Sequence, residues 1–182
     1  MELYCRIVNI FDEQLMEDFS KEHLDLGIQI LGGDASLITG KSYHDYENFY
    51  DWYREVSKLD LEEDLGKDQV GCSVYLVFRK NDDKLIGIFD IRHNLNFPNG
   101  NLLGHIGVDI RPSERSKGIY KNILELCIEE CKKNSIFSIV ISCEYDNIAS
   151  KRGIEHLFKL REEMVPFNGT YLYIYSIDCE EG

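Results

Sequence analysis

A long amphipathic helix with an apolar strand on either side most constrains the fold of this chain. Residues 103–110 are strand-like, residues 117–134 place their apolar side chains on one helical face, and residues 136–143 form a continuous apolar run. A strand, a helix and a second strand in this order predict a right-handed crossover with the two strands parallel. A continuous apolar strand is typical of a sheet that is covered on both faces.

The rest of the chain adds antiparallel strands and further helices. We expect a strand over 2–10, helices over 12–23 and 43–61, a hairpin over 72–79 and 85–92, a short helix over 147–157, and strands over 160–165 and 171–177. No internal repeat or linker divides the 182 residues, a length suited to one domain. The predicted fold class is therefore α/β, with a mixed sheet and helices on both of its faces.

The acidic composition limits the partners that this chain can bind. The formal net charge is -13, which disfavours nucleic acid and anionic membrane surfaces. It fits a cationic small molecule or a basic peptide only weakly, and solubility alone is the favoured explanation. No apolar run reaches the roughly 20 residues of a membrane span, and the acidic N-terminal residues are unlike a secretory signal. We expect a cytoplasmic protein.

The six cysteines indicate reduced thiols and not disulfides. Cys127 and Cys131 fall on a predicted helix, while Cys72 and Cys143 lie in apolar strand-like runs, so burial accounts for them. No Cys-x-x-Cys pair or Cys/His cluster predicts a metal site, and we expect no metal cofactor.

The turn before the long helix is the candidate ligand site. A helix N-terminus leaves backbone N–H groups without partners and carries positive partial charge, which suits a phosphate. The turn residues placed to use this are Arg115, Ser116, Lys117, Gly118 and Ile119. A bound pyrophosphate and a merely solvated basic helix start are equal alternatives. The turn matches neither GxxxxGK[ST] nor GxGxxG, which disfavours nucleotide hydrolysis and dinucleotide redox chemistry.

Two neighbouring segments resemble a known family. They are GHIGVDIRPSERSKGIYKNILELCIEECKK, residues 104–133, and IVISCEYDNIASKRGIE, residues 139–155. Their order of strand, RPSER-x-KG, helix, strand and DNxAS resembles the acetyl-CoA-binding core of the GNAT N-acetyltransferase superfamily. The resemblance is closest to its bacterial predicted-acetyltransferase branch, and it covers about residues 85–157.

The resemblance implies a fold, an activity and a domain organisation. The fold would be the GNAT (acyl-CoA N-acyltransferase) fold over residues 1–182 as one domain. Residues 1–68 would form the acceptor side, 70–157 the acetyl-CoA-binding core and 158–178 a C-terminal hairpin. The implied reaction is direct transfer of acetyl from the cosubstrate acetyl-CoA to a primary amine in a ternary complex. The acceptor would be a small-molecule or peptide amine, with a cationic acceptor and a homodimer left open.

The resemblance also implies contacts with the coenzyme. The pyrophosphate would lie on the backbone amides of residues 115–119, and the pantetheine arm would pair with the main chain near Val108 and Ile110. Asn147 and Ser150 would reach the coenzyme from the start of the following helix. The parallel strands that flank the long helix would splay apart, and the thioester would lie in the gap.

Three positions depart from the family pattern. Tyr120 stands where glycine or alanine is usual, Ile154 where a tyrosine often serves as general acid, and Phe158 where glycine is common. The resemblance therefore supplies no general acid. These departures motivate one alternative, a non-catalytic acyl-CoA-binding or sensor protein on the same fold. A structural interaction domain that has lost the coenzyme is a third hypothesis.

Acetyl transfer to an amine needs a group that takes a proton, directly or through water. The candidates near the predicted gap are Glu144, Asp109, His105 and His93. His105 and Asp109 share one strand face by alternation, and Glu144 ends a predicted parallel strand, where ligands gather. A hydrogen-bonded sheet histidine is the alternative for His105, and simple solvent exposure is the alternative for Glu144. Asp90 and Arg92 are expected to pair with each other.

An acidic stretch lies on the predicted acceptor side. Residues 45–68 carry nine acidic and three basic side chains, a net charge of −6, with aromatic side chains between them. Such a surface can attract a polyamine, an aminoglycoside or a lysine-bearing peptide. A solvated helix face is the favoured alternative.

Overall fold

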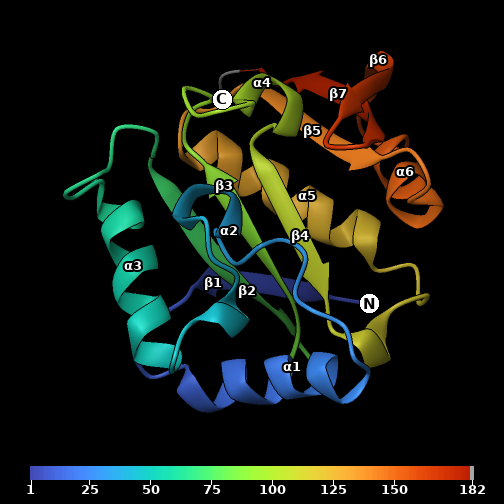
Figure 1. Ribbon diagram of the computed structural model, residues 1–182. Helices are drawn as coiled ribbons and strands as arrows, with labels where there is room; N and C mark the ends of the chain where they lie inside the picture. Colours follow the sequence, from blue (N-terminus) through green and yellow to red (C-terminus); the bar gives the residue numbers. More distant parts are fainter. Residues whose placement is uncertain (181–182) are drawn as a thin grey trace.

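The strands are arranged in two sheets, which Figure 1 shows in the computed structural model; it describes residues 1–180. The strands are β1 (Leu3–Ile7), β2 (Cys72–Arg79), β3 (Lys84–Arg92), β4 (Ile106–Ile110), β5 (Ser138–Glu144), β6 (Lys159–Phe167) and β7 (Thr170–Asp178). The helices are α1 (Glu13–Asp25), α2 (Ser36–Thr39), α3 (Phe49–Leu61), α4 (Gly100–Leu103), α5 (Tyr120–Lys133) and α6 (Ile148–Ile154). Two 3-10 turns, η1 (Tyr43–Asp45) and η2 (Pro112–Glu114), complete the elements of this range.

The larger sheet has the strand order β1-β2-β3-β4, and the smaller sheet has the order β5-β7-β6. The ladders between these strands are antiparallel. β4 and β5, which flank α5 in the sequence, lie in different sheets and are linked by one isolated antiparallel bridge between Gly104 and Ile141. The predicted α/β class is confirmed. The parallel relation predicted for β4 and β5 is not confirmed, because the two strands share no ladder.

Helices cover both faces of the larger sheet. Val74 and Leu76 of β2 pack in the core with α1 and α3, whereas Tyr75 and Val77 pack in the core with α5 and β5. Successive side chains of a strand point to opposite faces, so the two cores lie on opposite sides of β2. Figure 1 shows α1 and α3 on one side of the sheet and α5 on the other. This double burial explains why β2 is apolar at nearly every position.

The helix predicted over 43–61 divides into η1 and α3. α3 begins at Phe49 because the side chain of Asn48 caps it, accepting a hydrogen bond from a first-turn backbone N–H group. Its buried face consists of Phe49, Trp52, Val56 and Leu59. Tyr50 of the same helix is exposed.

The helix predicted from residue 117 begins at Tyr120. Ser116 and Gly118 have φ angles of 61° and 72°, and this left-handed conformation interrupts a right-handed helix. Residues 115–119, where the sequence predicted a ligand site, therefore form an irregular turn between β4 and α5.

The cysteines are free thiols, as predicted, and four of the six are buried. Burial raises the pKa of the Cys131 thiol to about 12, so this thiol stays protonated near neutral pH. Within residues 1–180, no helix is long and apolar enough to cross a membrane. Over the same range, no group of three or more His, Cys, Asp and Glu side chains is arranged to hold a metal ion.

Candidate active site

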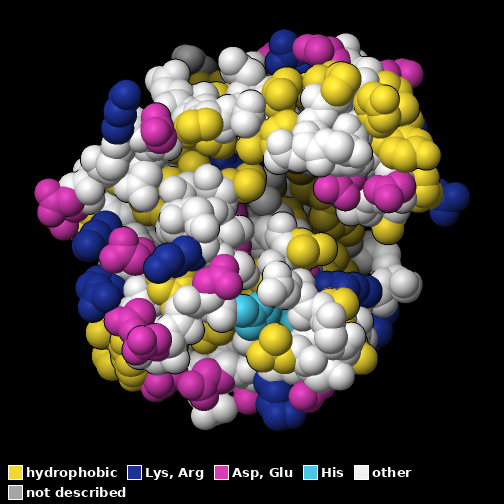
Figure 2. Space-filling model, in the orientation of Figure 1, with side chains coloured by type: hydrophobic (Ala, Val, Ile, Leu, Met, Phe, Trp, Pro, Cys, Tyr) yellow, Lys and Arg dark blue, Asp and Glu magenta, His cyan; other side chains and the backbone are white. Residues whose placement is uncertain are grey.

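A cavity of about 500 Å³ lies where the edge of the larger sheet meets the starts of α5 and α6. Figure 2 shows this hollow between the part that carries the smaller sheet with α6 and the part that carries β4. The lining residues are Leu31, Val108, Asp109, Ile110, Arg115, Ser116, Gly118, Ile119, Tyr120, Asn147, Ala149 and Ser150. They include every residue that the sequence predicted to bind coenzyme except Lys117.

One wall of the cavity is the open edge of β4. Arg92 donates its backbone N–H to the carbonyl of His105, and Arg111 donates to the carbonyl of Ile86, both at 2.8 Å. Hydrogen-bonded pairs alternate along an antiparallel ladder, so the backbone groups of Val108 point away from β3. On that side β4 has no ladder partner among residues 1–180. The strand can therefore accept an extended chain that carries amide groups.

The start of α5 forms a second wall of the cavity. The N-cap position is Ile119, whose side chain makes no capping hydrogen bond to the first turn. The first-turn N–H groups and the helix dipole are thus available to an anion. Ser116 and Gly118 bend the preceding backbone around this end of the helix. The geometry suits a phosphate or a pyrophosphate.

The arginine of the turn is held against the end of β4. Its Nε donates to the carbonyl of Ile110 at 2.9 Å, and its Nη2 donates to Asp109 Oδ1 at 2.9 Å. Arg115 therefore brings positive charge to the cavity with its guanidinium already fixed in place.

Lys117 is engaged elsewhere. Its Nζ lies 3.0 Å from Glu114 Oε2, and Arg79 and Lys84 bind the same carboxylate. Burial raises the pKa of Glu114, but the hydrogen bonds from Lys84 and Lys117 outweigh this effect and lower the pKa to about 2. The basic residues of this turn thus have two separate partners, Asp109 for Arg115 and Glu114 for Lys117.

The third wall of the cavity joins α5 to α6. The side-chain oxygen of Asn147 caps α6 by accepting a hydrogen bond from the Ser150 backbone N–H at 3.1 Å. Ser150 Oγ donates to the hydroxyl of Tyr120 at 2.9 Å. The Tyr120 ring fills the space beside Gly153, where a Cβ atom would overlap it. The large residue at position 120 therefore points along the cavity wall to α6.

The family model for the acetyltransferase (GNAT) family matches residues 41–158, about two thirds of the chain. The chain belongs to this GNAT family. The matched range contains β4, the turn, α5 and α6, so it includes the three walls of the cavity. The superfamily predicted from the sequence is confirmed. The bacterial branch and its motifs stay a prediction.

Solved GNAT structures share the fold of this protein. Ribosomal-protein-S5-alanine acetyltransferase from Vibrio fischeri has a TM-score of 0.66 and 14% identity, and the match covers 100% of this chain and 95% of that chain. A spermidine N-acetyltransferase SpeG chimera from Vibrio cholerae and hSSAT has a TM-score of 0.63 and 13% identity, with 98% and 96% covered. yncA from Salmonella typhimurium, solved with its cofactor acetyl-CoA, has a TM-score of 0.61 and 17% identity, with 99% and 95% covered. A search of curated protein sequences gave no match.

Of the four candidate bases of this GNAT protein, His93 does not line the cavity, and its ring nitrogens contact Glu62 and Ser73. The other three have different surroundings. Asp109 lines the cavity but is bound to Arg115, while Glu144 is exposed at the end of β5. His105 is buried, and its Nδ1 accepts a hydrogen bond from the backbone N–H of Val140 at 3.0 Å. Burial, and next the charge of Arg92, lower the pKa of His105 to about 4. Of the three, only Asp109 is part of the cavity wall.

The predicted pair of Asp90 and Arg92 is confirmed. Both side chains are buried, and Arg92 Nη2 lies 2.9 Å from Asp90 Oδ1. Gly107 on the neighbouring strand leaves room for them, because a Cβ atom there would lie 2.7 Å from Arg92 Nη2. This pair fixes the face of β3 and β4 that is turned toward α1.

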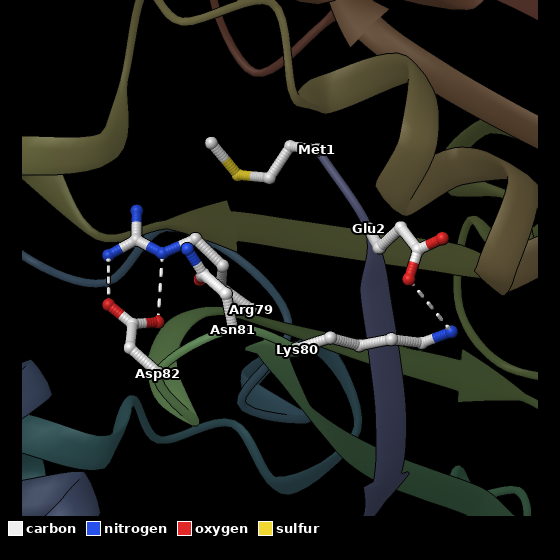
Figure 3. Close-up of a pocket in the computed structure, with 6 residues that line it drawn as sticks. All are labelled: Met1, Glu2, Arg79, Lys80, Asn81 and Asp82. Carbon is white, nitrogen blue, oxygen red and sulfur yellow. Dashed lines mark hydrogen bonds and ion pairs between the residues drawn. The ribbon is translucent and has the colours of Figure 1, made fainter.

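Another hollow on the molecule has no such features. Figure 3 shows Met1, Glu2 and residues 79–82 around it, with Arg79 paired to Asp82 and Glu2 paired to Lys80. Its four charged side chains are thus paired with one another.

Sequence reasoning missed two residues near the cavity. His23 comes from α1 and reaches both Asp109 and Arg115 although it is 86 and 92 positions away in the sequence. Leu31 lies on the segment after α1, and the residue is 86% exposed at the cavity. Neither residue belongs to a sequence motif, so no local signal marked either of them.

Proposed function

We propose that this GNAT protein is an N-acetyltransferase that moves acetyl from acetyl-CoA to a primary amine by direct attack. One observation carries the proposal: the open edge of β4 and the uncapped start of α5 share a single cavity. An arm with amide groups can pair with the strand while a pyrophosphate occupies the helix start. The residues present therefore fit acetyl-CoA.

The proposed coenzyme contacts follow from these walls. Val108 and Ile110 would bind the pantetheine amides through the main chain, and the turn over 115–119 would bind the pyrophosphate through its amides. Asn147 and Ser150 would contact the coenzyme from the start of α6. Lys117 would contribute its charge at longer range, because Glu114 already binds its Nζ.

Acetyl-CoA supplies a reactive thioester. The amine nitrogen forms a bond to the carbonyl carbon, and the carbon–sulfur bond breaks with its electrons on sulfur. The amine loses a proton in this process. His105 and Asp109 already hold fixed partners, so we assign the proton to Glu144 or to water in front of it. Glu144 and the Asn147 cap are three residues apart, which supports a position near the cavity.

The acceptor is proposed to enter from the side formed by residues 1–68, with the coenzyme held by residues 70–157 and residues 158–178 completing one domain. Two structural neighbours are named as acetyltransferases of spermidine and of ribosomal-protein-S5 alanine. These amines define the test panel. Within α3, Arg54 and Lys58 form ion pairs with neighbouring acids, which reduces the acidic surface left for a cationic acceptor.

Release of coenzyme A thiol tests the proposed function. The protein is mixed with acetyl-CoA and a panel that contains spermidine, an alanine-initiated peptide and a lysine peptide. Amine-dependent thiol release with formation of the acetylated amine supports transfer. Tight binding of acetyl-CoA without turnover on any amine would instead indicate a sensor, and no calorimetric signal with CoA would exclude a coenzyme site.

A charge reversal tests the assignment of the turn. Arg115→Glu is expected to weaken CoA binding by tenfold or more, with a steep dependence on salt, because the site would lose a cation beside the diphosphate. Lys117→Glu is the matched control and is expected to weaken binding less. Unchanged affinity in the Arg115 variant would place the diphosphate elsewhere.

A further inference from the structure

We propose that His23 is a positioning residue of the coenzyme site, acting from α1 on Arg115 together with Asp109. This inference rests on the proposed coenzyme site and adds a residue that lies outside the coenzyme-binding core predicted from the sequence. The observation behind it is a buried junction at which α1, β4 and the turn before α5 meet through three side chains.

His23 has a fixed place in this junction. Its side chain is fully buried, and its Nδ1 lies 2.9 Å from the carbonyl oxygen of Phe19. A carbonyl oxygen only accepts hydrogen bonds, so Nδ1 donates to it. The Nε2 atom lies 3.2 Å from Asp109 Oδ1 and 3.3 Å from Arg115 Nη2, so the ring contacts both members of this ion pair.

Two side chains hold Arg115 Nη2. Asp109 Oδ1 accepts its hydrogen bond at 2.9 Å, and His23 Nε2 lies 3.3 Å from it. The Nε hydrogen goes to the Ile110 carbonyl at 2.9 Å. The guanidinium is thereby held from three sides, which sets the orientation of its remaining donors and of the turn that follows.

Asp109 extends the junction to the rim of the cavity. Its Oδ2 accepts the backbone N–H of Leu31 at 2.8 Å, so the carboxylate joins the turn to the segment that carries Leu31. Gly32 packs on the main chain of Val108 in the same region. The junction therefore ties the coenzyme turn to a segment from the proposed acceptor side. It gives Asp109 a positioning role.

A double-mutant cycle on CoA affinity tests this inference. His23→Leu removes the ring contacts with Asp109 and Arg115 and is expected to weaken CoA binding by about tenfold in calorimetry. In an Arg115→Met background the same change is expected to have less than a twofold effect, because the residue through which His23 acts is gone. His23→Gln keeps a polar side chain that can donate to Asp109 and accept from Arg115, and it is expected to restore most of the affinity.

Two controls separate positioning from general loss of stability. Met16→Ala removes a fully buried side chain of the same helix and does not touch the junction, so it is expected to lower stability but leave CoA affinity unchanged. An equal loss of affinity in the Met16 variant, or an additive effect of His23→Leu in the Arg115→Met background, would overturn the inference.

The junction also has a readout without coenzyme. In ¹⁵N NMR of the protein without coenzyme, the His23 Nε2 resonance is expected to shift in Arg115→Met, because Arg115 Nη2 lies 3.3 Å from this atom. A wild-type protein that binds no CoA would refute the proposed function, whereas an unchanged Nε2 resonance would refute the junction itself.

Discussion

Tyr120 of α5 and Gly153 of α6 are complementary in size where they pack at the cavity wall. The resemblance predicts a small residue at position 120, and the tyrosine found there fits because position 153 of α6 is a glycine. The hydroxyl bond from Ser150 then fixes the ring. Burial raises the pKa of Tyr120, so its phenol stays protonated at neutral pH and serves the wall as a neutral hydrogen-bonding group.

A substitution at Gly153 tests this size complementarity. Gly153→Ala is expected to destabilise the protein by about 1–3 kcal/mol in urea unfolding, because the new methyl group overlaps the Tyr120 ring. In a Tyr120→Ala background the sign is expected to reverse, since alanine favours a helix over glycine by about 1 kcal/mol. Destabilisation of the same size in both backgrounds would contradict the packing described.

Glu114 is expected to stabilise the turn in a pH-dependent way. Its pKa of about 2 lies below the ordinary 4.5. The contribution of its carboxylate to the free energy of unfolding is therefore complete above pH 4.5 and is lost as the pH falls toward 2. Glu114→Gln is expected to cost about 1–3 kcal/mol at pH 7. The cost should shrink between pH 4.5 and pH 2 in denaturant titrations, and a cost independent of pH in that window would exclude the carboxylate as its source.

At the scale of elements, the turn between β4 and α5 depends on left-handed backbone. Gly118 has a φ of 72°, and a Cβ atom there would meet no heavy atom within 4 Å, so conformation and not space requires the glycine. The same is true of Gly169, whose φ is 83°, in the distant hairpin of β6 and β7. The two glycines thus form a matched pair, one at the cavity and one away from it.

Alanine at each of these glycines separates strain from function. Both Gly118→Ala and Gly169→Ala are expected to cost about 1–2 kcal/mol of stability, because an L-residue is strained in this conformation. Only Gly118→Ala is expected to weaken CoA binding in calorimetry, since it changes the backbone proposed to hold the diphosphate. Equal CoA affinity in both variants would count against the turn as the binding element.

In the whole molecule, a few hydrogen bonds next to the Gly104–Ile141 bridge link the two sheets. The backbone N–H of His105 donates to the Val140 carbonyl at 2.7 Å, and the N–H of Val140 donates to His105 Nδ1 at 3.0 Å. Beyond these bonds β4 and β5 share no ladder, and the cavity lies between β4 and the starts of α5 and α6. His105 thus links the two sheets as a structural residue.

The stability of the whole protein is expected to depend on pH through His105. Its pKa falls from 6.5 to about 4 on burial, so protonation favours the unfolded chain. This contribution is constant above pH 6.5 and destabilises by up to roughly 3 kcal/mol as the pH falls from 6.5 toward 4. His105→Gln offers Val140 an acceptor that does not titrate. The unfolding free energy of this variant should fall less than that of the wild-type protein between pH 6.5 and pH 4. An identical pH dependence in both proteins would contradict a buried, neutral His105.

The order of the elements and most of the residues that line the cavity could be predicted from the sequence because both are local. Apolar periodicity is a property of neighbouring residues, and the turn over 115–119 is a continuous segment beside α5. The two errors in helix starts have local causes as well: the cap at Asn48 delays α3, and positive φ angles at Ser116 and Gly118 delay α5. Such angles are rare for serine, so the sequence pattern did not indicate them.

The GNAT resemblance, the α/β class and the segments that surround the cavity could be inferred from the sequence alone, since they follow from motifs and short-range patterns. Which charged side chains already have partners was visible only in the folded protein. Arg115 binds Asp109 and His23, Lys117 binds Glu114, and His105 joins two sheets. These pairings depend on contacts between residues as many as 92 positions apart, and burial and electrostatics set them only after the chain has folded.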